Sequence, residues 1–138
     1  MIQANDLRIG NLIQLIYESN RPALEERIVR VDRIDEIGVE ILENGERVFG
    51  ASYELLEGIP LTEEILLKCG FVERKLAVDI HFWRIFIWGE VEFCVNPLKK
   101  IWYIASIGQN IARKDIQYLH QLQNLFWCLC GKELEVNL

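Results

Sequence analysis

Residues 61–71 (LTEEILLKCGF) carry the signals of a short helix and divide the chain into two β-rich halves. Thr62 is a favoured N-cap, and the two glutamates after it suit the positive end of a helix dipole. Leu61 and Leu66 stand at the positions of a hydrophobic staple, and Gly70 supplies a stop. The sequence therefore predicts a helix of about two turns between two sheets.

Short strands and tight turns precede this helix. Asn44–Gly45 is a favoured two-residue hairpin turn, because both residue types tolerate a positive φ. Alternating apolar residues, interrupted by a kink at Gly10, predict four strands, at residues 7–17, 27–35, 39–42 and 48–56. Four short strands joined in this way predict a small barrel-like or strongly bent antiparallel sheet.

The chain after the helix is again rich in strand-forming residues. Residues 78–88 (VDIHFWRIFIW) are apolar on both faces beyond their first positions, which is typical of a central strand covered on two sides. Residues 90–96 and 101–105 are predicted to pair across a turn at residues 96–99 (NPLK). One further short strand is expected before Asp115.

A last helix is predicted over residues 116–130, with Asp115 as N-cap and Gly131 as stop. Leu119, Leu122 and Phe126 belong to its apolar stripe. We expect an α+β fold with an acidic N-terminal antiparallel β subdomain over residues 1–58. Residues 59–138 are expected to form the short helix and an antiparallel sheet with the C-terminal helix packed on it.

The charge of the chain is unevenly distributed. The 138 residues include 15 Lys and Arg against 21 Asp and Glu, a net charge of −6. Residues 1–60 hold six of the basic and twelve of the acidic side chains, and residues 61–138 hold nine of each. The acidic excess belongs to the N-terminal half and disfavours direct binding to a nucleic-acid backbone.

The sequence indicates a cytoplasmic protein that does not associate with membranes. The first residues lack a basic segment followed by an apolar run, so we expect no signal peptide. The densest apolar stretch, residues 80–88, is nine residues long and contains Arg84, whereas a membrane span needs about 20. Without an export signal, we expect reduced thiols at Cys69, Cys94, Cys128 and Cys130.

No pattern of catalytic, metal-binding or cofactor-binding residues is recognisable. Cys128 and Cys130 lie on opposite sides of a helix, and the chain contains no C-x-x-C pair. The two histidines, His81 and His120, have no nucleophile motif beside them, and the glycines match no phosphate-binding loop. We therefore expect a protein that is not an enzyme and holds neither metal nor cofactor.

The last predicted helix has no side chain with a fixed charge between residues 116 and 131. Its polar face carries Gln117, His120, Gln121 and Asn124 at helical spacing. This face could be a solvated surface that happens to use amides. Alternatively, a second subunit or a protein partner covers it, which makes these four residues a candidate interface.

Three segments resemble a family of small uncharacterised bacterial and phage-encoded proteins. They are residues 7–11 (LRIGN), 59–71 (IPLTEEILLKCGF) and 119–136 (LHQLQNLFWCLCGKELEV). The resemblance implies a small stand-alone protein, often encoded by mobile or prophage-like DNA. It implies no activity and assigns no functional residues.

The function expected from the sequence is therefore non-catalytic. We expect a protein that self-associates or binds another protein through its last helix. The alternatives are an accessory protein of a nucleic-acid complex, or an acidic inhibitor that imitates nucleic-acid charge.

Overall fold

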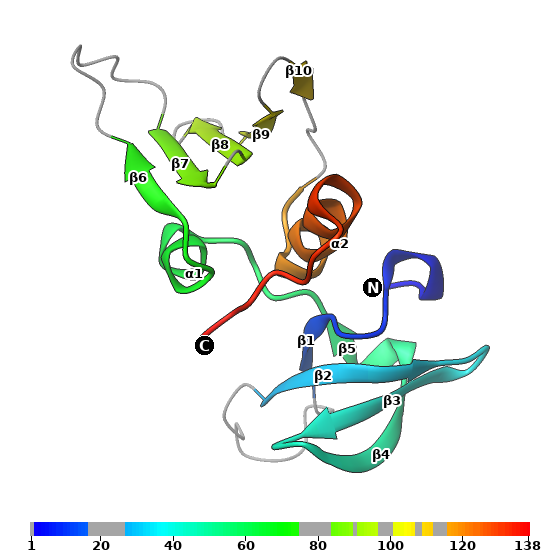
Figure 1. The fold of residues 1–138 in the computed structure, drawn as a ribbon. Coiled ribbons are helices and arrows are strands. Elements are labelled where there is room, and N and C mark those ends of the chain that lie inside the picture. The colour runs from blue at the N-terminus through cyan, green and yellow to red at the C-terminus, as the bar shows by residue number, and fades with distance from the viewer. Residues whose placement is uncertain are drawn as a thin grey trace. The chain divides into compact units, whose positions relative to one another are not determined.

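The computed structural model confirms an α+β fold with two antiparallel sheets, a short helix and a C-terminal helix (Figure 1). The chain forms two compact units. Unit 1 comprises residues 1–60 and 118–133, and unit 2 comprises residues 61–117 and 134–138. The structure describes residues 2–16, 27–74, 84–89, 91–96, 101–106, 109–111 and 116–138.

The sheet of unit 1 is a meander whose last strand returns to the first. In chain order its elements are η1 (Ala4–Asp6), β1 (Leu12–Leu15), β2 (Arg27–Ile34), β3 (Gly38–Glu43), β4 (Glu46–Ser52), η2 (Tyr53–Leu55) and β5 (Leu56–Glu57). The strand order is β4-β3-β2-β1-β5, and every pair described is antiparallel. The edge strands β4 and β5 are therefore consecutive in sequence.

This connection forces the sheet to bend. The outer strands of a flat five-stranded sheet lie about 19 Å apart. The three residues of η2 connect β4 to β5, and even a fully extended link of this length would span at most about 14 Å. Register shifts in β2 and between β3 and β4 add local bends. The strongly bent sheet predicted from the sequence is thus present.

The predicted hairpin turn is confirmed. Asn44 and Gly45 both have positive φ, at 51° and 81°, and they join β3 to β4. Gly38, at the start of β3, is needed for a different reason: a Cβ there would lie 2.0 Å from the backbone oxygen of Ala51 on β4. Each glycine thus fixes one end of the β3–β4 pair.

The concave side of this sheet holds the core of unit 1. Val29 and Val31 alternate inward along β2, while Ile28 before them and Arg30 between them are exposed. The buried cluster comprises Ile2, Leu7, Ile13, Val29, Val31, Val39, Ile41 and Leu56. The N-terminal residues before β1 therefore belong to the core.

Unit 2 begins with the predicted short helix, α1 (Glu63–Lys68). The Thr62 hydroxyl accepts a hydrogen bond from the Ile65 N–H at 3.2 Å, Leu66 is fully buried, and Gly70 has a φ of +86°. A meander in chain order follows, with strands β6 (Val72–Arg74), β7 (Arg84–Trp88), β8 (Val91–Asn96), β9 (Ile101–Ser106) and β10 (Gln109–Ile111). Of the predicted 78–88 strand, residues 84–88 are in β7.

Helix α2 (Leu119–Cys130) departs from the prediction in two ways. It begins three residues after Ile116, because the backbone there pairs with residues 59–61 instead: Tyr118 bridges Pro60, and the Leu119 N–H donates to the Ile59 carbonyl. Moreover, α2 groups with the N-terminal sheet in unit 1, whereas the sequence placed it on the second sheet within residues 59–138. The two units therefore do not follow a single boundary at residue 58.

Several predicted features lie outside the described residues. These are the beginning of the 78–88 strand with His81, the turn after Asn96, and the Asp115 N-cap. In the described part of the chain, no helix has the length and hydropathy that a membrane crossing requires.

Candidate functional site

The polar face of α2 lies largely inside unit 1. His120 is only 2% exposed, and the Asn124 amide bonds to the Asn11 side chain and to the Asp6 carbonyl. Gln121 is partly buried and accepts a hydrogen bond from the Tyr118 N–H at 3.1 Å, while Gln117 is exposed and precedes the helix. The surface that covers His120 and Asn124 is thus provided by the chain itself.

The residue that joins α2 to the sheet was not among those predicted. Gln123 is fully buried, and its side-chain oxygen accepts a hydrogen bond from the Leu12 N–H at 2.9 Å. Leu12 pairs with Arg30 of β2 on one side, but β5 on the other side reaches only Gln14 and Leu15, so in the described part of the chain no strand lies beside Leu12 on that edge of β1. The Gln123 amide therefore takes the place of a strand at that point.

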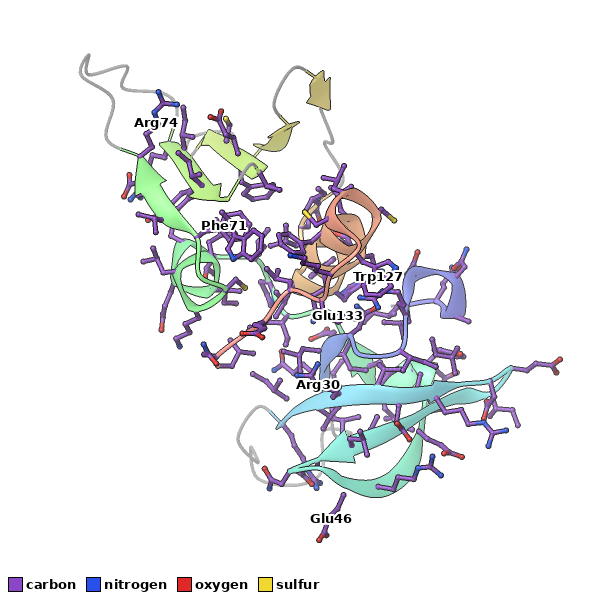
Figure 2. The ribbon with its side chains drawn as sticks, viewed as in Figure 1. Arg30, Glu46, Phe71, Arg74, Trp127 and Glu133 are labelled. Atoms are coloured by element: carbon purple, nitrogen blue, oxygen red, sulfur yellow. The ribbon has the colours of Figure 1, made fainter. Side chains whose placement is uncertain are left out.

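An ion pair after the end of α2 forms a second contact between this helix region and the N-terminal part of unit 1. The Arg8 guanidinium binds both carboxylate oxygens of Glu133, with one N–O distance of 2.8 Å, and its Cζ lies 4.8 Å from the centre of the Trp127 ring. Figure 2 shows Trp127 and Glu133 near the end of α2. The pairing lowers the pKa of Glu133 and raises that of Arg8. These residues lie in two of the segments that carry the family resemblance, so unit 1 brings those segments together.

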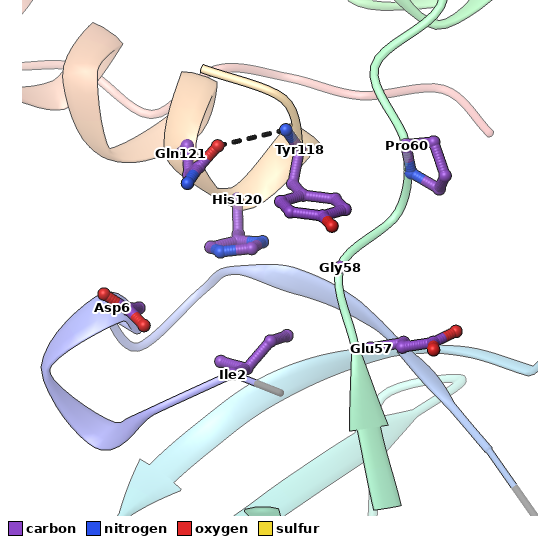
Figure 3. A pocket seen from close by; sticks show the side chains of 8 residues that line it. All are labelled: Ile2, Asp6, Glu57, Gly58, Pro60, Tyr118, His120 and Gln121. Atoms are coloured by element: carbon purple, nitrogen blue, oxygen red, sulfur yellow. Dashed lines mark hydrogen bonds between the residues drawn. The ribbon is translucent and has the colours of Figure 1, made fainter. Parts of the chain in front are cut away.

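A pocket of about 370 Å³ opens at the other end of α2 (Figure 3). It lies between η1, the chain leaving β5, and the first turn of α2. Its lining residues are Ile2, Asp6, Glu57, Gly58, Pro60, Tyr118, His120 and Gln121. All of them belong to unit 1.

The wall of the pocket is fixed by a close approach. A Cβ on Gly58 would lie 2.6 Å from ring atoms of Tyr118, so the tyrosine ring rests directly on the glycine backbone. The Tyr118 ring also stacks on His120, with ring centres 5.7 Å apart and planes inclined by 12°. Backbone pairing of Tyr118 with Pro60 holds this arrangement.

His120 forms a neutral, polar part of the pocket lining. Burial lowers its pKa below 6.5, although the nearby Asp6 carboxylate opposes that shift. Its Nδ1 atom is buried and has no hydrogen-bond partner among the described residues. Buried polar atoms are normally hydrogen-bonded, so a buried nitrogen that is unpaired among the described residues is an unusual feature beside a pocket.

The charged groups of the pocket are both carboxylates. Asp6 lies on η1 and accepts a hydrogen bond from the Gln3 N–H, and Glu57 ends β5. Both are exposed, and within the described residues neither forms an ion pair. No lysine or arginine among the described residues lines the pocket.

The other groups considered from the sequence form no site in the described part of the chain. No group of three metal-binding side chains occurs there. Cys69 is buried in unit 2, and burial raises its pKa to about 12, whereas Cys128 is exposed. Thr62 serves as the N-cap of α1.

The last turns of α2 expose three consecutive side chains without charge. Trp127 and Leu129 are 42% and 36% exposed, and Cys128 between them is also exposed. We call these three residues the outer strip; because consecutive residues of a helix point about 100° apart, they are distributed around the last turns of α2 and do not share one face. No charged residue interrupts α2 between Leu119 and Cys130.

The chain was compared with models of protein families, with curated proteins and with solved structures, and none of them matches it.

Proposed function

We propose that this protein is a non-catalytic interaction module whose unit 1 binds a basic surface of another protein. The observation that carries this proposal is that the described arginines of unit 1 form ion pairs or hydrogen bonds within the unit. The acidic residues in excess therefore have no arginine partner there.

The described arginines of unit 1 have partners inside it. Four form ion pairs: Arg8 with Glu133, Arg27 with Glu43, Arg33 with Glu40, and Arg47 with Asp32. The fifth, Arg30, donates to the Gly10 carbonyl at 2.9 Å.

Several carboxylates of unit 1 lack such compensation. Among the described residues, no ion pair involves Asp6, Glu36, Glu46, Glu54 or Glu57. All the net charge of the chain falls in unit 1, because the residues of unit 2 carry equal numbers of acidic and basic side chains. The negative electrostatic potential of unit 1 attracts basic proteins and repels acidic ones.

Capture from host lysate tests the proposal with the full-length protein immobilised. We expect the bound proteins to be basic and to be released as salt rises, since the Debye length falls from about 10 Å at 0.1 M to about 3 Å at 1 M. Glu57→Lys should weaken capture. Glu135→Lys changes the net charge equally on an exposed residue of unit 2 and serves as the control.

The proposal is wrong if the captured proteins are acidic or neutral, or if salt does not release them. It is also wrong if the two lysine variants weaken capture equally, because the charge of unit 1 would then have no special role. Displacement of a captured protein by DNA would instead support an inhibitor that imitates nucleic-acid charge.

Self-association is a second candidate function, favoured by the outer strip. Aromatic residues are enriched at protein interfaces, and an uncharged helix surface with an exposed tryptophan suits a second copy of the chain. Light scattering after size-exclusion chromatography should then give twice the chain mass of 16.2 kDa, and Trp127→Glu should restore the monomer. A monomeric wild-type protein at high concentration would exclude this candidate.

A further inference from the structure

We propose that the pocket between η1, the exit of β5 and the first turn of α2 binds the guanidinium group of an arginine side chain from a partner protein. This inference rests on the proposed function and names the group that unit 1 would recognise. It is carried by the charge, the hydrogen-bonding groups and the shape of the pocket.

The charge of the pocket selects a cation. Asp6 and Glu57 contribute two carboxylates, and none of the lining residues in the described part of the chain is basic. The start of α2 opposes them with only about half a positive charge. His120 adds no charge at neutral pH, because burial lowers its pKa.

The hydrogen-bonding groups call for a ligand with several donors. The carboxylates of Asp6 and Glu57 are acceptors, and the amide of Gln121 also lines the pocket. The buried Nδ1 of His120 has no partner in the described part of the chain, and a neutral imidazole can accept through this atom. A guanidinium offers five N–H donors and no acceptor, so it matches this set.

The shape of the pocket favours a planar group. Tyr118 lines one wall and is held against the Gly58 backbone, which fixes the plane of its ring. The ring also stacks on His120, so a cation would meet the edge of this aromatic pair, where a planar guanidinium fits better than a compact and strongly hydrated ammonium. A volume of about 370 Å³ is at the lower end of the range for ligand pockets, which suits a single side chain.

The probe for this site is Nα-acetyl-L-arginine amide, titrated into the full-length ¹⁵N-labelled protein and followed by NMR. Both ends of the probe are blocked, so its only charge is the guanidinium. The matched control probe is Nα-acetyl-L-citrulline amide, which has nearly the same shape and no charge. We expect saturable shifts of the His120 ring nitrogens and of the Glu57 and Gln121 amides, with a Kd on the order of millimolar for one side chain.

Conservative variants then locate the site. Glu57 is exposed, and exposed charge pairs contribute modestly, so Glu57→Gln should raise the Kd about threefold to fivefold. Asp6→Asn should raise the Kd to a similar extent, since it also removes one carboxylate charge. Asparagine keeps an acceptor for the Gln3 N–H, so the variant should retain the η1 turn. Glu46→Gln removes the same charge from the β3–β4 hairpin, away from the pocket, and should change the Kd less than about twofold.

Three outcomes would overturn the inference. They are equal binding of the citrulline probe, shifts that do not saturate or that avoid the pocket residues, and equal weakening by Glu57→Gln and Glu46→Gln. If the arginine probe fails while lysate capture stays salt-sensitive and Glu57→Lys still weakens it, only the pocket assignment is wrong. If capture also fails, the proposed function is wrong as well.

Discussion

Replacing Gln123 by leucine should remove the hydrogen bond that joins α2 to the edge of β1. The Gln123 side-chain oxygen accepts from the Leu12 N–H at 2.9 Å, and both residues are buried. Leucine is close to glutamine in size, so little cavity forms, but the Leu12 N–H loses its acceptor. A buried donor left in this way costs about 1–3 kcal/mol, and we expect the free energy of unfolding of unit 1 to fall by about 2 kcal/mol.

Two measurements check this value. Hydrogen exchange followed by NMR should show the protection of the Leu12 amide reduced by about 30-fold, which corresponds to about 2 kcal/mol. The thermal midpoint should fall by roughly 4–10 °C for a chain of this size. Gln117→Leu makes the same chemical change at an exposed residue just before α2, and it should shift the free energy of unfolding by less than about 0.5 kcal/mol.

The reasoning fails if Gln123→Leu leaves the Leu12 amide as protected as in the wild type. That result would mean that the N–H finds another acceptor and that the glutamine does not replace a strand. It also fails if the two leucine variants lose equal stability, because burial would then make no difference.

Three further predictions concern a thiol, a pH dependence and a glycine. Under native conditions Cys128 should react with iodoacetamide before Cys69, which is buried and has a pKa of about 12; mass spectrometry of the labelled protein checks the order. Because burial lowers the pKa of His120, unit 1 should keep its full stability above about pH 6.5 and lose stability as the pH falls below it. Thermal midpoints measured at a series of pH values check this, and His120→Gln should reduce their fall below pH 6.5. Gly58→Ala should destabilise by about 1–3 kcal/mol in denaturant unfolding, since its Cβ would contact a tyrosine ring at 2.6 Å, whereas Gly50→Ala meets its nearest atom at 3.7 Å and should cost less.

Features that depend on neighbouring residues could be predicted from the sequence. The Thr62 cap and the Gly70 stop of α1 are fixed within one stretch of eleven residues. The Asn44–Gly45 turn likewise needs only the φ preferences of its two residues. Strands β1 to β4 and β7 to β9 overlap strands predicted from alternation and turns in the same way, whereas the short strands β5 and β6 were not predicted.

Features that depend on distant residues could not be predicted. The hydrogen bond from Leu12 to Gln123 joins residues 111 positions apart, and neither residue alone signals it. The start of α2 was placed too early because Asp115 and Ile116 are acceptable helix-start residues. The pairing of Tyr118 with Pro60, which no local pattern reveals, keeps Tyr118 extended and delays the start of the helix.

The pocket shows the same limit more sharply. Of its lining residues, only His120 and Gln121 were selected from the sequence, through their place on an uncharged helix face. Asp6 and Glu57 gave no local signal, because isolated carboxylates are common on any surface. Only the short β5 and the turn η1 bring them to the same pocket.

The lack of fixed charge on α2 does not by itself indicate a partner protein, because some of its uncharged polar side chains form hydrogen bonds within unit 1. Asn124 both donates and accepts within unit 1, and Gln123 supplies a buried acceptor to β1. A lysine or glutamate in either place would be buried without a counter-ion, which costs several kcal/mol. Amides therefore fit that face whether or not another protein binds the helix. Among the described residues, Glu57 forms no ion pair, the Asp6 carboxylate accepts a hydrogen bond only from the Gln3 N–H, and the Nδ1 of His120 has no hydrogen-bond partner. These groups, and not the uncharged helix face, support an external ligand.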